Sequence, residues 1–118
     1  MAKISLETLS SVDGFVASAL VDSSSGLALA TLGSSIDLEL AAAGNTEVLR
    51  AKRKTAESLH LNDHIEDILI TLGKQYHILR PLDRNADLFL YLVLDRQKAN
   101  LAMARHDLRK FEKDLDFS

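Results

Sequence analysis

Short apolar runs separated by polar turn residues dominate the first third of the chain. Residues 15–21 and 27–32 are two such runs, and the segment between them is Asp22-Ser23-Ser24-Ser25-Gly26. Asp and Ser side chains hydrogen-bond to nearby backbone groups and Gly accepts a positive φ, so this segment has the composition of a tight turn. The pattern therefore predicts a β-hairpin over residues 15–32.

A helix is expected on each side of this hairpin. Residues 3–11 carry spaced apolar side chains among polar ones, which is typical of a short amphipathic helix. Residues 36–59 contain no Pro and one Gly and are rich in Ala, which predicts a long helix. We expect this helix to start at Gly33-Ser34-Ser35, because a Ser side chain can accept from the first free backbone N–H groups. Asp37 then lies near the positive end of the helix dipole.

The second half of the chain predicts a second hairpin and a further strand. Residues 64–72 and 75–82 have the composition of strands, and Gly73-Lys74 between them has the length of a hairpin loop. Pro81 cannot donate to a ladder, so the second of these strands should end near it. Residues 88–94 are almost all apolar, as expected for a central strand that is buried on both faces.

The last predicted element is an amphipathic helix over residues 97–115, with Asp95 as its expected cap. Its apolar residues recur at every third or fourth position, which gives one apolar face. The predicted order is therefore α-β-β-α-β-β-β-α, in a single domain over residues 1–118. Hairpins with covering helices indicate an α+β fold with a central antiparallel sheet of about five strands.

Composition and charge exclude several classes of function. The net charge of −3 gives no basic footprint of the kind that nucleic-acid binding requires. The chain has no cysteine, which excludes disulfides and thiolate chemistry. No segment approaches the roughly 20 apolar residues of a membrane span, and the N-terminus lacks the apolar core of a signal peptide. We therefore expect a cytoplasmic protein.

No catalytic, cofactor-binding or metal-binding group is predicted, so the chain is not expected to be an enzyme. It has no phosphate-binding glycine loop, and turn and cap roles explain its carboxylates. His60 and His64 have the i, i+4 spacing of metal ligands on a helix. The helix should end there, however, and on a strand the same spacing separates the two rings by about 13 Å.

The start of the chain resembles the roadblock family, the dynein light chain roadblock type. That family opens with a short helix, a strand, a turn similar to V-D-x-x-G-L-x-L-A, and a second strand. The matching residues are Leu6, Leu9, Gly14, Val21, Asp22, Gly26, Leu27, Leu29 and Ala30. The predicted order of elements is also that of the family. The resemblance covers nearly the whole chain. It is to a stand-alone, prokaryotic member of the roadblock family.

This resemblance implies a layered fold and a dimer. The long helix should cover one face of the sheet and the terminal helices the other, a layout that profilin-like domains share. The implied assembly is a homodimer or a heterodimer with a homologous subunit, paired through edge strands at residues 64–72 and long helices at residues 36–59. An unpaired edge strand is an aggregation hazard, and residues 68–70 carry no charge that would guard it.

Small side chains form one stripe along the long helix, at spacings of three and four residues. They allow close approach either to the sheet of the same chain or to the same helix of a second protomer, and the pattern leaves both interpretations open. The expected dimer interface consists of Ala41, Gly44, Val48, Ala51, Thr55, Ile65, Asp67, Ile68, Leu69 and Ile70.

The family further implies a partner, a small Ras-like GTPase, which the domain binds, regulates or scaffolds. In relatives the long helices of the dimer form the surface that faces the GTPase. The corresponding residues here are Glu47, Arg50, Arg53, Lys54 and Glu57, although a solvated helix face with i, i+4 charge pairs also explains them. The alternative function is a small-ligand sensor with a profilin-like sheet, in which Phe15, Tyr91 and residues 88–94 line a pocket.

Overall fold

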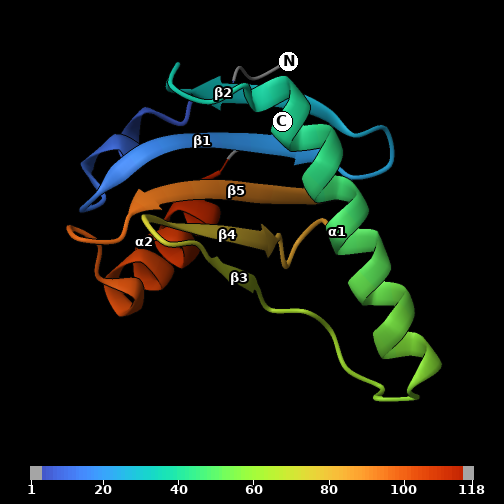
Figure 1. Ribbon diagram of the computed structural model, residues 1–118. Helices are drawn as coiled ribbons and strands as arrows, with labels where there is room; N and C mark the ends of the chain where they lie inside the picture. Colours follow the sequence, from blue (N-terminus) through green and yellow to red (C-terminus); the bar gives the residue numbers. More distant parts are fainter. Residues whose placement is uncertain (1–3, 116–118) are drawn as a thin grey trace.

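The computed structural model describes residues 4–115 and contains five strands, two α-helices and one 3₁₀ helix (Figure 1). The elements, in chain order, are η1 (Glu7–Ser11), β1 (Phe15–Asp22), β2 (Leu27–Leu32), α1 (Leu38–Ser58), β3 (Ile68–Thr71), β4 (Gln75–Pro81), β5 (Leu88–Asp95) and α2 (Leu101–Asp114). This is the predicted order of elements, and the α+β class is confirmed.

The five strands form one antiparallel sheet in the order β2-β1-β5-β4-β3. The last strand in sequence, β5, therefore lies in the middle, where it pairs with β1 on one side and β4 on the other. All of its residues except Asp95 are buried, which confirms the central strand that its apolar composition predicts. The two edges of the sheet are β2 and β3.

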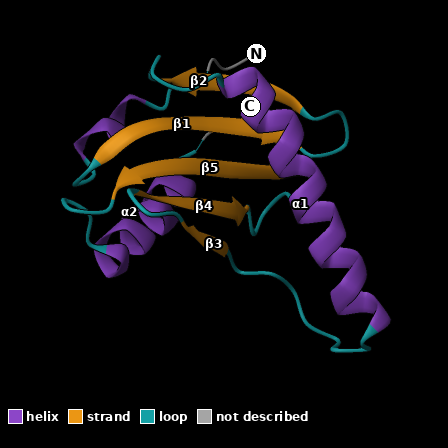
Figure 2. Cartoon of the chain, viewed as in Figure 1, coloured by secondary structure: helices purple, strands orange, loops and turns teal. Residues whose placement is uncertain are grey.

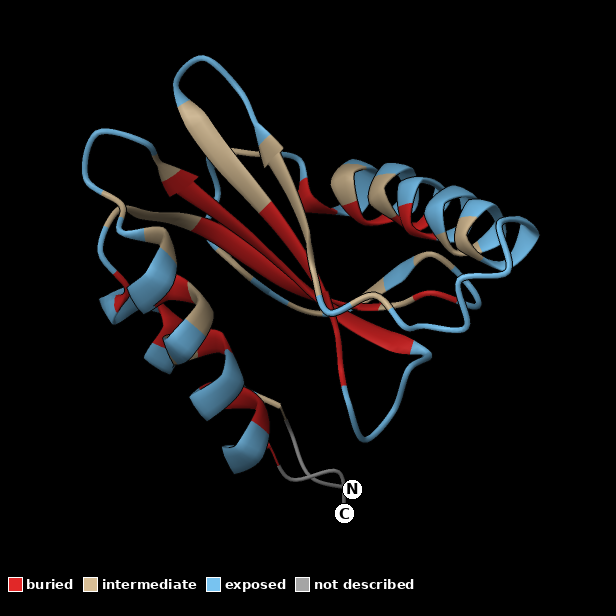
Figure 3. Ribbon diagram, turned by 90° about the horizontal axis from the view of Figure 1, so that it is seen from below, coloured by how far each residue is buried: buried red, intermediate tan, exposed pale blue. Residues whose placement is uncertain are grey.

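Helices cover both faces of the sheet, and the layered layout is confirmed (Figure 2). Helix α1 buries Leu38, Ala42 and Leu49 in a cluster that includes Phe89 and Tyr91 of β5. The opposite cluster joins η1 and α2 to the other side of the same strands. Figure 3 shows the buried residues concentrated in the strands and in the helix faces turned toward them. Among residues 4–115, no helix is long and apolar enough to cross a membrane.

Two glycines of the family-like signature have backbone conformations that side chains rarely adopt. Gly14 has a φ of 81° and Gly26 a φ of 77°. A Cβ atom at Gly14 would also lie 2.9 Å from the carbonyl oxygen of Asp95, because the chain crosses the end of β5 there. The glycines of the signature are thus required by the turns into β1 and into β2.

Both predicted helix caps are wrong. The N-cap of α1 is Asp37, whose carboxylate accepts from the N–H of Leu40 at 3.1 Å, rather than a Ser of residues 33–35. The N-cap of α2 is Asn100, which accepts from the N–H of Met103. Asp95 instead accepts from the N–H of Gln97 with its side chain, and the turn that it begins delays the helix to residue 101.

Strand β3 is shorter than the predicted residues 64–72, and the sequence of β4 supplies the reason. Ile68 faces Leu79, so a longer strand would place Glu66 opposite Pro81. The N–H of residue 81 would have to point toward β3, and proline has none. The ladder therefore begins only at Ile68. The predicted first helix also shortens, since η1 starts at Glu7 and residue 3 lies outside the described residues.

A buried ion pair fastens α2 to the end of β4. Arg80 and Glu112 are 4% and 5% exposed, and Nε of Arg80 donates to the carboxylate at 3.2 Å. The second carboxylate oxygen accepts from the N–H of Asp83 at 2.6 Å. Arg84 adds hydrogen bonds to the carbonyl oxygens of Glu112 and Leu115. Both oxygens of the buried carboxylate are thus satisfied, which is the condition for a buried ion pair to be tolerated.

Candidate interaction site

Strand β3 presents unpaired backbone groups along its outer edge. The N–H of Leu72 donates inward to the carbonyl of Gln75 at 2.8 Å. Backbone direction alternates along a strand, so Ile68 and Ile70 also turn their N–H and C=O groups toward β4. Leu69 and Thr71 consequently direct theirs to the free edge, where a further strand can pair with them.

The opposite edge of the sheet is protected differently. Strand β2 has two exposed leucines, Leu27 and Leu29, but its pairing with β1 contains an irregularity between Leu20 and Val21. Bulges of this kind twist an edge and discourage pairing with another chain. The register of β3 with β4 runs without interruption, so β3 is the edge better suited to accept a strand.

Most of the stripe of small residues on α1 lies away from the face that packs on the sheet, although Ala41 at its start is partly buried and packs against the cluster under the helix. The buried side of the helix consists of Leu38, Ala42, Thr46 and Leu49, whereas Gly44, Ala51 and Thr55 are exposed and Val48 is 40% exposed. A Cβ atom at Gly44 would meet nothing within 4 Å. The fold of one chain therefore gives no reason for a glycine at this position.

Two exposed leucines extend the stripe in both directions. Leu40 is 70% exposed and Leu59 is 60% exposed, and each lies four residues from a member of the stripe. A pattern of small residues alone does not include these two leucines, although the same i, i+4 spacing relates them to Gly44 and Thr55. Figure 1 shows that α1 continues beyond β3, so its C-terminal end projects past the edge of the sheet.

Two members of the predicted partner-binding set hold α1 to neighbouring loops. Arg50 donates to the carbonyl oxygens of Ser23 and Ser24 at 2.6 and 2.9 Å. Arg53 donates to the carbonyl oxygen of Ala86 at 2.7 Å. Glu47 lies 3.4 Å from Arg50 on the exposed side of the helix. Lys54 and Glu57 are also exposed. The five side chains therefore lie on one helix, but two of them already have structural contacts.

The carboxylate of Asp67, another predicted interface residue, is bound within its own chain. Arg105 of α2 donates to both of its oxygens, at 2.8 and 3.1 Å. These hydrogen bonds raise the pKa of the Arg105 guanidinium above its ordinary value. The pair joins the segment just before β3 to α2 and so contributes to the position of the edge strand.

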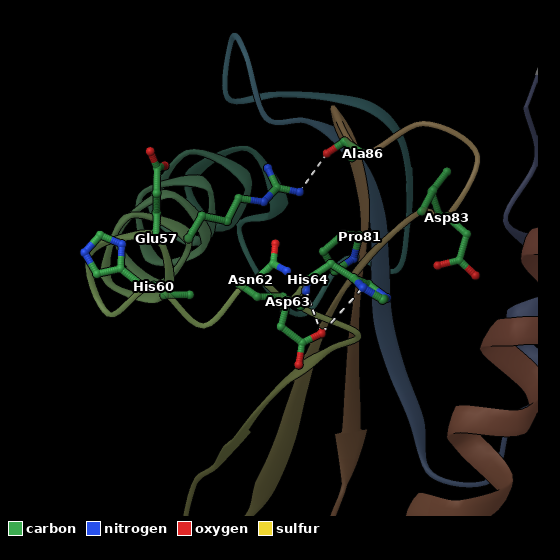
Figure 4. A pocket seen from close by; sticks show the side chains of 12 residues that line it. Glu57, His60, Asn62, Asp63, His64, Pro81, Asp83 and Ala86 are labelled. Carbon is green, nitrogen blue, oxygen red and sulfur yellow. Dashed lines mark hydrogen bonds and ion pairs between the residues drawn. The ribbon is translucent and has the colours of Figure 1, made fainter.

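A cavity of about 870 Å³ lies between the C-terminal half of α1, the segment that follows it and the end of β4. His60 and His64 both line it, and Figure 4 shows that their rings point in different directions. His64 is 3.7 Å from the carboxylate of Asp63. No group of three or more His, Asp or Glu side chains within residues 4–115 is arranged to hold a metal ion.

Hydrogen-bonded polar side chains connect the neighbouring strands β4 and β5. Nδ1 of His77 lies 3.0 Å from the hydroxyl of Tyr91, and Nε2 lies 2.9 Å from the amide oxygen of Gln75. Burial lowers the pKa of His77, because the charged imidazolium is poorly solvated there. Tyr91 belongs to the cluster under α1, whereas Phe15 packs against the cluster on the other face. The sheet thus separates the two aromatic residues that were expected to line one ligand pocket.

Comparison with sequences identifies no relative. No protein-family model matches the chain, and no curated protein matches it either.

Comparison with solved structures gives a consistent result. A Roadblock/LC7 domain from Streptomyces avermitilis has a TM-score of 0.79 and 14% identity, covering 91% of this chain and 88% of that one. The gliding protein MglB from Thermus thermophilus has a TM-score of 0.77 and 17% identity, covering 92% and 80%. MglC from Myxococcus xanthus has a TM-score of 0.56 and 22% identity, covering 93% and 95%. The chain therefore has the roadblock-type fold that its sequence resembles.

Protonation of His77 should make the stability of the protein depend on pH. Because its folded pKa lies below the ordinary 6.5, stability is fully present above 6.5 and is lost as the pH falls through the folded pKa. Urea unfolding at about pH 7.5 and about pH 5.5 should show a smaller pH difference for His77→Gln than for the wild type. The control is His64→Gln, since the His64 side chain is 82% exposed. Equal pH differences in all three proteins would contradict this expectation.

Proposed function

We propose that this chain is a dimeric, non-catalytic interaction module of the cytoplasm that binds or regulates a small Ras-like GTPase, or scaffolds a complex that contains one. The observation that carries the proposal is the free edge of β3 beside an exposed stripe of small residues on α1. Two copies can satisfy both features at once, the second being either this chain or a homologous subunit.

The free edge of β3 supports the proposed dimer. Within β3, Ile68, Leu69 and Ile70 are only partly buried, and the outward N–H and C=O groups of Leu69 lie at the free edge. A second β3 strand would pair with these groups and cover apolar side chains at the same time. Ile65, just before the strand, packs against the cluster under α1 and continues the same surface.

The helix stripe supports the same assembly. A glycine inside a helix costs roughly 0.5–1 kcal/mol relative to alanine, and Gly44 has no neighbour in its own chain that would require it. Close approach of a second helix would require it. Because α1 projects past β3 (Figure 1), this helix would lie over the sheet of a second copy that is joined at that edge.

The GTPase is proposed from the roadblock resemblance, with the fold as support. The solved structures with this fold include proteins named MglB and MglC. The exposed charged residues of α1, above all Lys54 and Glu57, remain the proposed contacts. Arg50 and Arg53 are weaker candidates for direct contact, since a partner would have to compete with the carbonyl oxygens that they now bind.

Replacement of Gly44 by Leu should abolish self-association and leave the protomer folded. The added side chain points into open space in one chain and would separate two helices that meet there. Sedimentation velocity should show a dimer for the wild type and a monomer for Gly44→Leu, with unchanged circular dichroism. The matched control is Ala43→Leu, an exposed position about 100° around the helix, which should remain dimeric. A folded Gly44→Leu dimer of wild-type affinity would argue against the helix contact.

Immobilised protein should capture a small GTPase from the native lysate in one nucleotide state only. The measurement compares lysate supplied with a non-hydrolysable GTP analogue and lysate supplied with GDP, followed by mass spectrometry of the retained proteins. Lys54→Glu should lower the retained amount, because it reverses an exposed charge on α1. Lys110→Glu makes the same charge change on α2 and should retain as much as the wild type. Capture that is independent of nucleotide would count against the GTPase proposal.

A further inference from the structure

The last turns of α2 and the turn that follows β4 enclose a small cavity of about 290 Å³. It belongs to the α2 side of the sheet, away from the cluster under α1. Four of its lining side chains are cations and two are carboxylates, so the cavity has a formal charge of +2. The lining residues are Arg80, Asp83, Arg84, Arg109, Glu112 and Lys113.

The most buried of these cations, Arg80, does not use all of its donors within the protein. Its Nε donates to Glu112, but Nη2 is 3.7 Å from the carboxylate of Asp83, and neither Nη atom has a hydrogen bond to any of residues 4–115. Within the same residues, no fully buried side-chain nitrogen or oxygen lacks a partner. The Nη groups are therefore reached by solvent, and the cavity that Arg80 lines is the opening to them. A guanidinium that is 4% exposed thus offers its remaining donors to an anion there.

Two further cations at the cavity have no partner in the described part of the chain. Arg109 and Lys113 are exposed and lie four residues apart on one face of α2. Neither forms a hydrogen bond or an ion pair with any of residues 4–115. The helix dipole favours a cation in the last turn, which is a sufficient reason for Lys113. It does not explain why Arg109, one turn earlier, and the open donors of Arg80 meet at the same cavity.

The two carboxylates of the cavity differ in how firmly they are held. Both oxygens of Glu112 accept hydrogen bonds, one from Arg80 and one from the N–H of Asp83. The side chain of Asp83, in contrast, is 69% exposed, and its ion pair with Arg80 is long. Exposed ion pairs contribute little to stability. An anion of higher charge can therefore take the place of the Asp83 carboxylate beside Arg80.

We propose that this cavity binds a phosphate monoester group, supplied either by free phosphate or by a phosphorylated serine side chain. Such a group carries a charge of about −1.5 to −2 at pH 7, which matches the formal charge of the cavity, whereas a carboxylate carries a single charge. Its oxygens accept from several donors at once, and guanidinium groups are well suited to this. The volume of about 290 Å³ suits a phosphate group better than a whole nucleotide. The site is separate from β3 and α1, so it does not depend on the proposed dimer or on a GTPase.

Titration of the protein with inorganic phosphate, followed by heteronuclear NMR at constant ionic strength, tests this proposal. The Nε–H signals of Arg80 and Arg109 should shift and saturate with a Kd of about 1 mM. Acetate should bind about tenfold more weakly, because it carries a single charge. The amide of N-acetyl-phosphoserine is the second probe. Tighter binding of this probe than of phosphate would identify a phosphorylated partner as the source, and weaker or equal binding would identify free phosphate.

Four variants at exposed positions fix the direction of the expected effects. Arg109→Gln and Lys113→Gln should each raise the Kd for phosphate about tenfold, the effect of losing one charge-assisted hydrogen bond. Asp83→Asn should lower it, because the variant removes the carboxylate that competes for Arg80. Lys110→Gln, on the same helix but at a different cavity, should bind phosphate as the wild type does.

The variants should have unchanged circular dichroism, so that a change in Kd reports on binding rather than on folding. Absence of a saturable shift at Arg80 would overturn the proposal. Equal Kd values for the wild type, Arg109→Gln and Lys113→Gln would also overturn it, as would weaker phosphate binding by a folded Asp83→Asn protein.

Discussion

Burial of strand β5 on both faces is the constraint on which the rest of the structure depends. Residues 88–94 lose contact with water completely or nearly so, and this requires a strand on each side and a layer on each face. The strands β1 and β4 supply the first requirement, and α1 opposite η1 and α2 supplies the second. With β5 in the middle, the short strand β3 is left at the edge, and α1 projects past it.

The contacts at the ends of the elements hold these layers in place. Arg50 and Arg53 tie α1 to the turns at the ends of the strands, and the buried Arg80–Glu112 pair ties α2 to β4. Arg105 and Asp67 connect α2 to the start of β3. Each arginine donates hydrogen bonds to a carbonyl or carboxylate oxygen. Because these bonds have preferred directions, they restrict the relative position of the two elements more than apolar contacts do. The edge strand is consequently held by its own chain at one side and unpaired at the other.

The sequence was sufficient for the elements and their order, since those depend on local patterns. The limits of β2 were predicted correctly, and α1 differs from its expected range by two residues at its start and one at its end. Caps and strand lengths were harder because they depend on partners distant in sequence. The length of β3, for example, depends on Pro81 across the sheet. The hydrogen bonds of Arg50 and Arg53 could not be predicted from the sequence either, since no periodicity shows which backbone carbonyl an arginine will reach.

The central claim is that the outer edge of β3 is paired with another strand in solution. Hydrogen–deuterium exchange at single-residue resolution over a range of protein concentrations tests it most directly. The account predicts that the amides of Leu69 and Thr71 exchange rapidly in dilute protein and become protected as concentration rises. The inward amides of Ile70 and Leu72 serve as an internal reference, because β4 already binds them in one chain. Rapid exchange of Leu69 and Thr71 at every concentration would contradict the account.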